Sequence, residues 1–196
     1  MNLCIDNQSK CGLDTMFLVY SSLQEHPASA ICEQFILSRE GWVSTPLLLV
    51  EFYSVLTRNY GVDRQSARQK TMEIVGKPIE ILSLEEHTVT AAIRLASEHN
   101  LDTNDAILLQ TCLNSDINII ATDDRRFARA CDDWGISVEN PITPTVRQQM
   151  ADWEEANLPP RGLPRLLLPI HRWLEARDPN IAEVFYEATG RCLHLP

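Results

Sequence analysis

Apolar residues along the chain occur in short runs that alternate with segments of helical spacing. Short runs of strand-forming residues predict strands at 42–44, 78–82, 117–121 and 136–138. Between them, apolar positions three or four residues apart predict helices at 16–23, 27–39, 46–60, 63–76, 83–100, 102–114 and 124–134. Strands separated by helices favour an α/β fold with a mainly parallel sheet.

The beginning of the chain holds two candidates for the first strand of this sheet. Residues 2–6 and residues 11–14 are both short and mostly apolar, and they end in Asp6 and Asp14 respectively. Only one of the two can be the first core strand. Either acid can therefore be the one that follows this strand.

Prolines change the character of the chain after residue 141. We expect an α/β domain over residues 1–143 and a helical, proline-punctuated C-terminal extension over residues 144–196, with helices at 145–157, 167–177 and 179–189. Gly190 is expected to end the last of them. The apolar faces of these helices need a partner, which is the chain's own first domain, a second copy or another protein.

Composition narrows the functional classes. The 196 residues carry a formal net charge of -10, which argues against a broad basic surface for nucleic acid but leaves room for a narrow basic strip. None of the six cysteines forms a CxxC pair, so we expect reduced thiols in a cytoplasmic protein. No apolar run is long enough to cross a membrane.

Glu51 lies in an unusual place, within the run Leu47–Leu56 that is apolar on nearly every side. An unpaired carboxylate in such a helix costs several kcal/mol or becomes protonated. A cation must therefore stabilise it. The cation is either an arginine, Arg58 or Arg94, or a bound metal ion.

Further acids are predicted at strand ends and helix starts. Asp14 follows a strand and precedes a helix, Asp105 lies in the first turn of the helix that Asp102 opens, and Asp123 and Asp124 follow the strand 117–121. Each of these acids can be an ordinary helix cap, and one of the last two is expected to be one.

The combination of these acids indicates metal chemistry. The carboxyl ends of parallel strands meet at one edge of the sheet, so the acids can gather there. Carboxylates that gather without cations repel one another unless a divalent metal neutralises them, and ligation by oxygen alone selects Mg²⁺ or Mn²⁺. Such a site can hydrolyse phosphodiesters. The sequence has no GxSxG, HExxH or glycine-rich phosphate loop to support another chemistry.

Four segments together resemble the PIN (PilT N-terminus) domain family, and most of all the VapC-type toxin ribonucleases of bacterial toxin–antitoxin modules. The similarity spans about residues 11–143. Met16 departs from the family, which commonly has asparagine there. The matching segments are Leu13-Asp14-Thr15, Ser44-Thr45-Pro46 with Leu49-Val50-Glu51, Thr103-Asn104-Asp105-Ala106, and Ile120 to Phe127.

The resemblance implies a three-layer α/β/α domain and an Mg²⁺- or Mn²⁺-dependent endoribonuclease. The metal-holding, catalytic acids it implies are Asp14, Glu51, Asp105 and Asp124. Supporting roles fall to Thr15, Thr122, Asp102 and Asp123. Arg125 and Arg126 are candidates for contacts to the RNA phosphates, although two solvated arginines would look the same in sequence.

We therefore expect a toxin ribonuclease that forms a homodimer and is neutralised by an antitoxin protein. One alternative is a non-catalytic PIN scaffold that binds protein or RNA through its C-terminal helices. Another is a nuclease that acts on DNA, which the acidic composition disfavours.

Overall fold

The computed structural model describes residues 10–158 and 163–193, without the side chains of 163–166 and 190–193. Five short strands form one sheet: β1 (Cys11–Leu13), β2 (Trp42–Ser44), β3 (Ile79–Ile81), β4 (Ile119–Ala121) and β5 (Ser137–Glu139). Their order is β3-β2-β1-β4-β5 and all pairs are parallel, as predicted. The segment 11–14 thus contains the central strand, whereas the rival strand 2–6, with Asp6, lies outside the described residues.

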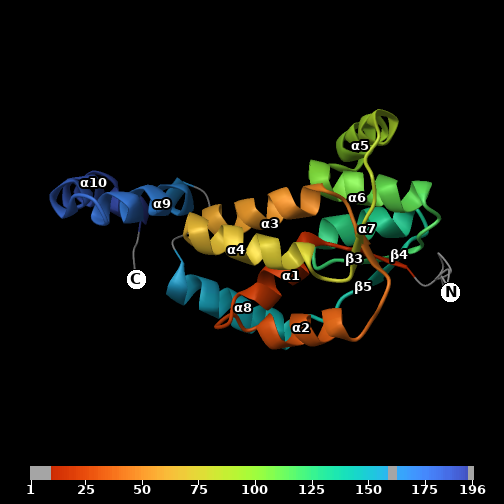
Figure 1. Cartoon of the computed structure of the whole chain (residues 1–196), viewed down its shortest axis with the longest axis horizontal. Coiled ribbons are helices and arrows are strands. Elements are labelled where there is room, and N and C mark those ends of the chain that lie inside the picture. The colour runs from red at the N-terminus through yellow and green to blue at the C-terminus, as the bar shows by residue number, and fades with distance from the viewer. Residues whose placement is uncertain (1–9, 159–162, 194–196) are drawn as a thin grey trace.

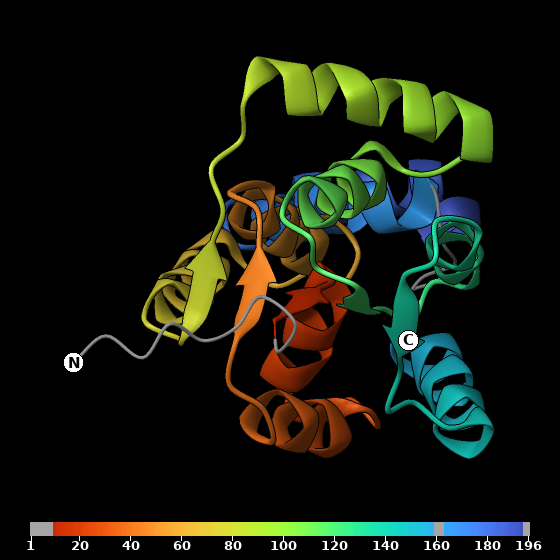
Figure 2. The same ribbon diagram turned by 90° about the vertical axis from the view of Figure 1, so that its right-hand side faces the viewer.

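Helices cover both faces of the sheet, so the predicted three-layer α/β/α arrangement is confirmed (Figure 1). One layer packs around Phe17, Phe52 and Trp42, and the other around Val43, Leu109 and Phe127. The first layer consists of α1 (Thr15–Ser22), α2 (Ser29–Leu37), α3 (Leu47–Arg58), α4 (Arg64–Val75) and α8 (Pro144–Asn157). The second consists of α5 (Glu86–His99), α6 (Thr103–Asn114) and α7 (Arg125–Asp133), with α5 outermost (Figure 2).

Gly12 allows the central strand to approach α6 closely. A Cβ atom at this position would lie 2.8 Å from the Cys112 sulfur and 2.9 Å from the Ile120 side chain. Real Cβ atoms do not approach other atoms so closely, so only glycine permits this packing. The close approach packs the last turn of α6 directly against the central strand.

The helix around Glu51 is apolar on nearly every side in sequence, but only one of its faces is buried. Leu48, Phe52 and Leu56 form a buried stripe four residues apart, whereas Val50 is 64% exposed. One face of α3 packs on the core and the other faces solvent. Pro46 occupies the N-cap position of α3, and no side chain bonds the first turn.

The first helix of the extension belongs to the core. Met150 of α8 is buried, and Trp153 packs against the same cluster as the residues of α1 and α2. α8 therefore docks on the chain's own α/β domain, while the boundary at residue 143 stays a prediction.

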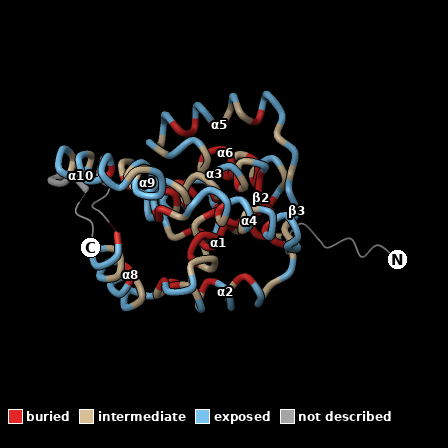
Figure 3. The backbone as a smooth tube through the Cα atoms, turned by 60° about the vertical axis from the view of Figure 1, so that its left-hand side comes forward, coloured by how far each residue is buried: buried red, intermediate tan, exposed pale blue. Residues whose placement is uncertain are grey.

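The last two helices, α9 (Leu163–Glu175) and α10 (Pro179–Leu193), pack on each other and project beyond the end of α3 (Figure 1). Most of their described residues are exposed (Figure 3). The prediction that Gly190 ends α10 is wrong, since the helix continues to Leu193. Pro169 lies inside α9, as in the predicted helix 167–177, but α9 begins earlier, at Leu163.

Candidate active site

The candidate site lies where the strand order of the sheet reverses. Leu13 of β1 pairs with Ala121 of β4, so the residues that follow, Asp14 and Thr122, leave the sheet side by side. The chain continues from β1 to β2 and β3 on one side and reaches β4 and β5 on the other. Such a switch point, at the carboxyl ends of the strands, is where open α/β sheets bind ligands.

Asp14 and Thr122 are joined by a short hydrogen bond. The Thr122 hydroxyl donates to Oδ2 of Asp14 at 2.6 Å, and the backbone N–H of Met16 donates to Oδ1 at 3.1 Å. Burial raises the pKa of Asp14 to about 6, the two hydrogen bonds oppose this, and the charges of Glu51 and Asp124 add to it. Asp14 caps α1, yet it is only 6% exposed, which is unusual for a simple helix cap.

Glu51 faces the same edge of the sheet from α3. The Thr15 hydroxyl donates to Oε2 of Glu51 at 2.7 Å. Burial raises the pKa of Glu51, the Thr15 hydrogen bond lowers it, and the charge of Asp102 raises it further. The proposed ion pair with Arg58 or Arg94 is wrong: neither arginine pairs with Glu51 in the described structure, and Arg94 lies beside Glu98.

The third acid, Asp105, lies in the first turn of α6, which Asp102 caps by accepting the N–H of Asn104 at 3.1 Å. Burial raises the pKa of Asp105 to about 8, together with the charges of Asp14, Glu51, Asp124 and Asp102. Asp105 is therefore the acid most strongly affected by the others.

Asp123 and Asp124 have different surroundings. Asp124 caps α7, with its Oδ1 accepting the N–H groups of Arg126 at 2.6 Å and Phe127 at 2.9 Å, so the expected cap is confirmed. Thr122 also receives the N–H of Asp124 at 3.1 Å. Asp123 instead forms a bidentate ion pair with Arg147 of α8, at 2.5 and 3.2 Å. Its carboxylate ties the loop after β4 to the extension.

Four acids thus influence one another electrostatically without a basic partner. Within residues 10–158 and the described part of 163–193, no Lys, Arg or His forms a salt bridge with Asp14, Glu51, Asp105 or Asp124. Asp14, Glu51 and Asp105 line one small cavity together with Thr15, Ser44 and Asn104. No three acidic, His or Cys side chains of the described residues converge closely enough to enclose a metal ion.

The donor set nevertheless suits a hard cation. The potential ligand atoms here are all carboxylate or hydroxyl oxygens, which Mg²⁺ and Mn²⁺ prefer. They belong to Asp14, Glu51, Asp105, Thr15 and Thr122. A divalent charge here would offset the mutual repulsion that raises the pKa values of Asp14 and Asp105.

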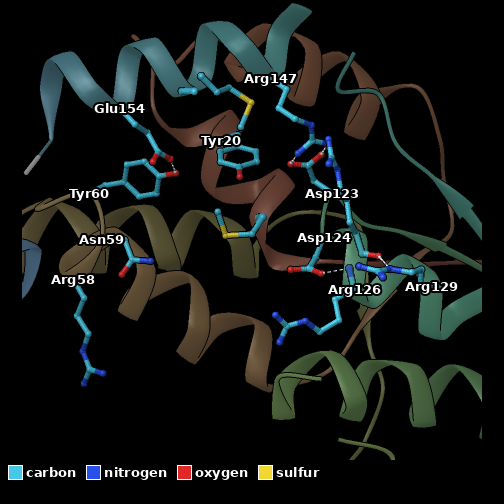
Figure 4. A pocket seen from close by; sticks show the side chains of 14 residues that line it. Tyr20, Arg58, Asn59, Tyr60, Asp123, Asp124, Arg126, Arg129, Arg147 and Glu154 are labelled. Atoms are coloured by element: carbon cyan, nitrogen blue, oxygen red, sulfur yellow. Dashed lines mark hydrogen bonds and ion pairs between the residues drawn. The ribbon is translucent and has the colours of Figure 1, made fainter. Parts of the chain in front are cut away.

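A pocket of about 780 Å³ adjoins the acids, between α1, α3, α7 and α8 (Figure 4). Arg125 and Arg126 line it as candidates from the sequence, and Arg126 also donates to the Asn100 carbonyl at 3.0 Å. Arg58, Arg129 and Arg147 also line it; sequence reasoning missed the last two and considered Arg58 only as a partner of Glu51. Spacing could have found two of these, because Arg58 is two turns after Glu51, and Arg129 is one turn after Arg125.

The model of the PIN domain matches residues 12–133, more than half of the chain. The chain belongs to the PIN domain family. PIN domains are in general nucleases, enzymes that hydrolyse phosphodiester bonds. The matched residues contain all four acids and end before α8, so the extension lies outside the PIN match.

Solved structures similar to this PIN domain include the crystal structure of VapBC2 from Rickettsia felis bound to a DNA fragment from their promoter. The identity is 14%, the alignment covers 66% of this chain and 96% of that chain, and the TM-score is 0.48. No curated protein sequence matches this chain. None of the helices in the described residues is long and apolar enough to cross a membrane.

Proposed function

We propose that this PIN domain is a metal-dependent endoribonuclease and the toxin of a toxin–antitoxin module. The observation that carries the proposal is the group of carboxylates Asp14, Glu51 and Asp105 on one cavity, with Asp124 beside them and no basic partner among the described residues. A protein that only needed stability would gain from pairing or losing these charges.

In this proposal Asp14, Glu51, Asp105 and Asp124 hold Mg²⁺ or Mn²⁺. Carboxylates that repel one another in the metal-free protein move closer when a cation neutralises them. When bound, the metal supplies Lewis-acid stabilisation of the charge that develops on the phosphate oxygens.

The neighbours of the acids keep them oriented. Thr122 donates to Asp14 and receives the N–H of Asp124, so one hydroxyl fixes two of the proposed ligands relative to each other. The Thr15 hydroxyl donates to Glu51 and orients this single carboxylate. Asp102 holds the start of α6, and Asp123 anchors the loop that carries Asp124. Thr122, Thr15, Asp102 and Asp123 are therefore positioning residues. In the same proposal, Arg125 and Arg126 on the wall of the pocket contact phosphates of the RNA.

The partners and location follow from the same proposal. The RNA is the substrate, a small antitoxin neutralises the enzyme, and two copies form a homodimer in the cytoplasm. The net charge of -10 disfavours tight binding to long duplex DNA, whose charge density is higher than that of a single strand.

A cleavage assay tests this function. Labelled single-stranded RNA, structured RNA and DNA are incubated with the parent protein, Asp14→Ala, Asp105→Ala and the exposed control Asp132→Ala, with Mg²⁺, Mn²⁺ or EDTA. We expect metal-dependent cleavage of RNA by the parent and the control. Loss of cleavage in the two site variants, with the circular dichroism spectrum intact, supports the assignment. Equal cleavage by all four proteins contradicts it, and cleavage of DNA alone moves the substrate to DNA.

A second function, a non-catalytic scaffold, is favoured by the hairpin of α9 and α10. Trp173 is 53% exposed and Val184 is 64% exposed, which leaves apolar side chains at the end of the molecule farthest from the sheet. This alternative predicts that Asp14→Asn leaves the binding of the protein or RNA partner unchanged, whereas Trp173→Ala or Val184→Ala abolishes that binding.

A further inference from the structure

The pocket between α3, α7 and α8 combines basic side chains with a position next to the acids. Five of the chain's seventeen Lys and Arg residues line it: Arg58, Arg125, Arg126, Arg129 and Arg147. Asp123, Asp124 and Glu154 are the acids on its lining. The pocket is therefore a basic surface within a protein whose net charge is -10.

Most of these arginines have guanidinium donors to spare. Arg147 is committed to Asp123. Within the described residues, no carboxylate forms an ion pair with Arg58, Arg125, Arg126 or Arg129. Arg129 uses only Nε, which donates to the Arg125 carbonyl at 3.2 Å, and so keeps both terminal nitrogens. Cationic donors on the wall of a pocket fit anionic oxygen ligands such as phosphates.

The arginines lie on both sides of Asp124. In the view of Figure 4, Asp124 lies between Arg58, which extends from the α3 side, and Arg129 on the α7 side. Asp124 also interacts electrostatically with Asp14 and Asp105. A strand whose phosphate lies at the acids would place neighbouring phosphates within the basic pocket.

The outer wall of the pocket comes from the extension. Arg147, Met150 and Glu154 belong to α8, beyond residues 12–133 that match the PIN model. The Asp123–Arg147 ion pair and the buried Met150 fix α8 in place. Residues outside the PIN match thus supply one wall of the pocket.

We propose that this pocket binds the sugar–phosphate backbone of a single nucleic-acid strand next to the bond that is cleaved, with Arg58 and Arg129 as the main phosphate contacts. The inference rests on the proposed nuclease function and adds the path of the substrate. The pocket has a volume of about 780 Å³, in the upper range of pockets that enclose small ligands, which is enough for a short stretch of one strand. Positive charge that follows the backbone is how proteins hold single strands without reading their sequence.

The test measures binding separately from cleavage. A fluorescein-labelled RNA 12-mer is titrated with the full chain in EDTA, in the Asp105→Asn background, which keeps position 105 uncharged at every pH. Arg58→Ala and Arg129→Ala are compared with Arg68→Ala, an exposed arginine of α4 outside the pocket. All three changes remove the same charge from an exposed position.

We expect each pocket variant to weaken binding by about 3- to 10-fold and the control by less than about twofold. Each lost phosphate contact should also reduce the dependence of log K on log salt by about 0.7. Three results would overturn the inference: equal binding by all variants, equal weakening by Arg68→Ala, or no binding by the Asp105→Asn protein with all its arginines present.

The experiments distinguish failure of the pocket proposal from failure of the nuclease proposal. If the pocket arginines matter for binding but the parent cleaves no RNA, the nuclease proposal fails and the pocket stands. If the parent cleaves RNA and Arg58→Ala and Arg129→Ala leave both KM and oligonucleotide binding unchanged, the pocket assignment fails and the nuclease proposal stands.

Discussion

Replacing Asp105 by asparagine should stabilise the metal-free protein. Asp105 lies among the negative charges of Asp14, Glu51 and Asp124, and its side chain forms no hydrogen bond in the described structure. Asparagine has nearly the same shape and no charge. The substitution therefore removes repulsion and desolvation cost without removing a contact.

The size of the effect follows from the pKa of Asp105, which is raised from 3.8 to about 8. A shift of about four units corresponds to at most ~6 kcal/mol. Because the residue is only partly buried, solvent screening reduces this several-fold, and we expect a gain of about 1–2 kcal/mol. For a chain of this size that is an increase in Tm of about 3–6 °C.

Because the pKa of Asp105 is raised, the direction in which stability changes with pH is also determined. A raised pKa means that the folded protein binds the proton more tightly than the unfolded chain, so the parent loses stability as the pH rises from about 4 to about 8. The variant lacks this loss. The difference in Tm should be absent near pH 4, grow with pH and level off above about pH 8.

Differential scanning fluorimetry in EDTA across this pH range measures the effect. Asp132→Asn, an exposed position on α7 with the same charge change, is the control and should shift Tm by less than about 1 °C. The reasoning is refuted if Asp105→Asn melts at or below the parent near pH 7.5, if the gain is the same at pH 4, or if the control gains as much.

Three further substitutions test other parts of the account by urea denaturation. Thr122→Val removes the donor to Asp14 and the acceptor for Asp124, and should cost about 1–3 kcal/mol, whereas the exposed Thr90→Val should change little. Arg147→Ala leaves the Asp123 carboxylate, 9% exposed, without its ion pair and should cost about 1–3 kcal/mol; a loss below about 0.3 kcal/mol would show that α8 is not held there. Gly12→Ala places a methyl group 2.8 Å from the Cys112 sulfur and should cost about 1–3 kcal/mol, unlike Gly76→Ala, whose added Cβ meets only a carbonyl oxygen at 3.6 Å.

The centre of the sheet was predictable because β1 and β4 are short apolar runs, each followed by a polar residue. Leu13-Asp14 and Ala121-Thr122 mark two of these ends, and a parallel pairing brings them together. The acids were therefore predictable as a group from the chain alone. Their helix caps were also predictable, since Asp102 and Asp124 open helices with free N–H groups.

Other features depend on contacts that no local pattern encodes. The exposure of Val50 follows from how α3 packs on the core, not from its apolar sequence. The partner of Asp123 is Arg147, 24 residues later and on a different helix, so the sequence could not separate Asp123 from Asp124. The basic pocket joins four helices and became visible only in three dimensions.

The central claim is that the carboxylates hold a divalent metal, and titration calorimetry with Mn²⁺ tests it without knowledge of the substrate. The proteins compared are the parent, Glu51→Gln, and Glu33→Gln as an exposed control on α2. The account predicts binding by the parent and the control, and its loss in Glu51→Gln. Absence of binding at millimolar Mn²⁺ in the folded parent, or equal binding by Glu51→Gln, would contradict it.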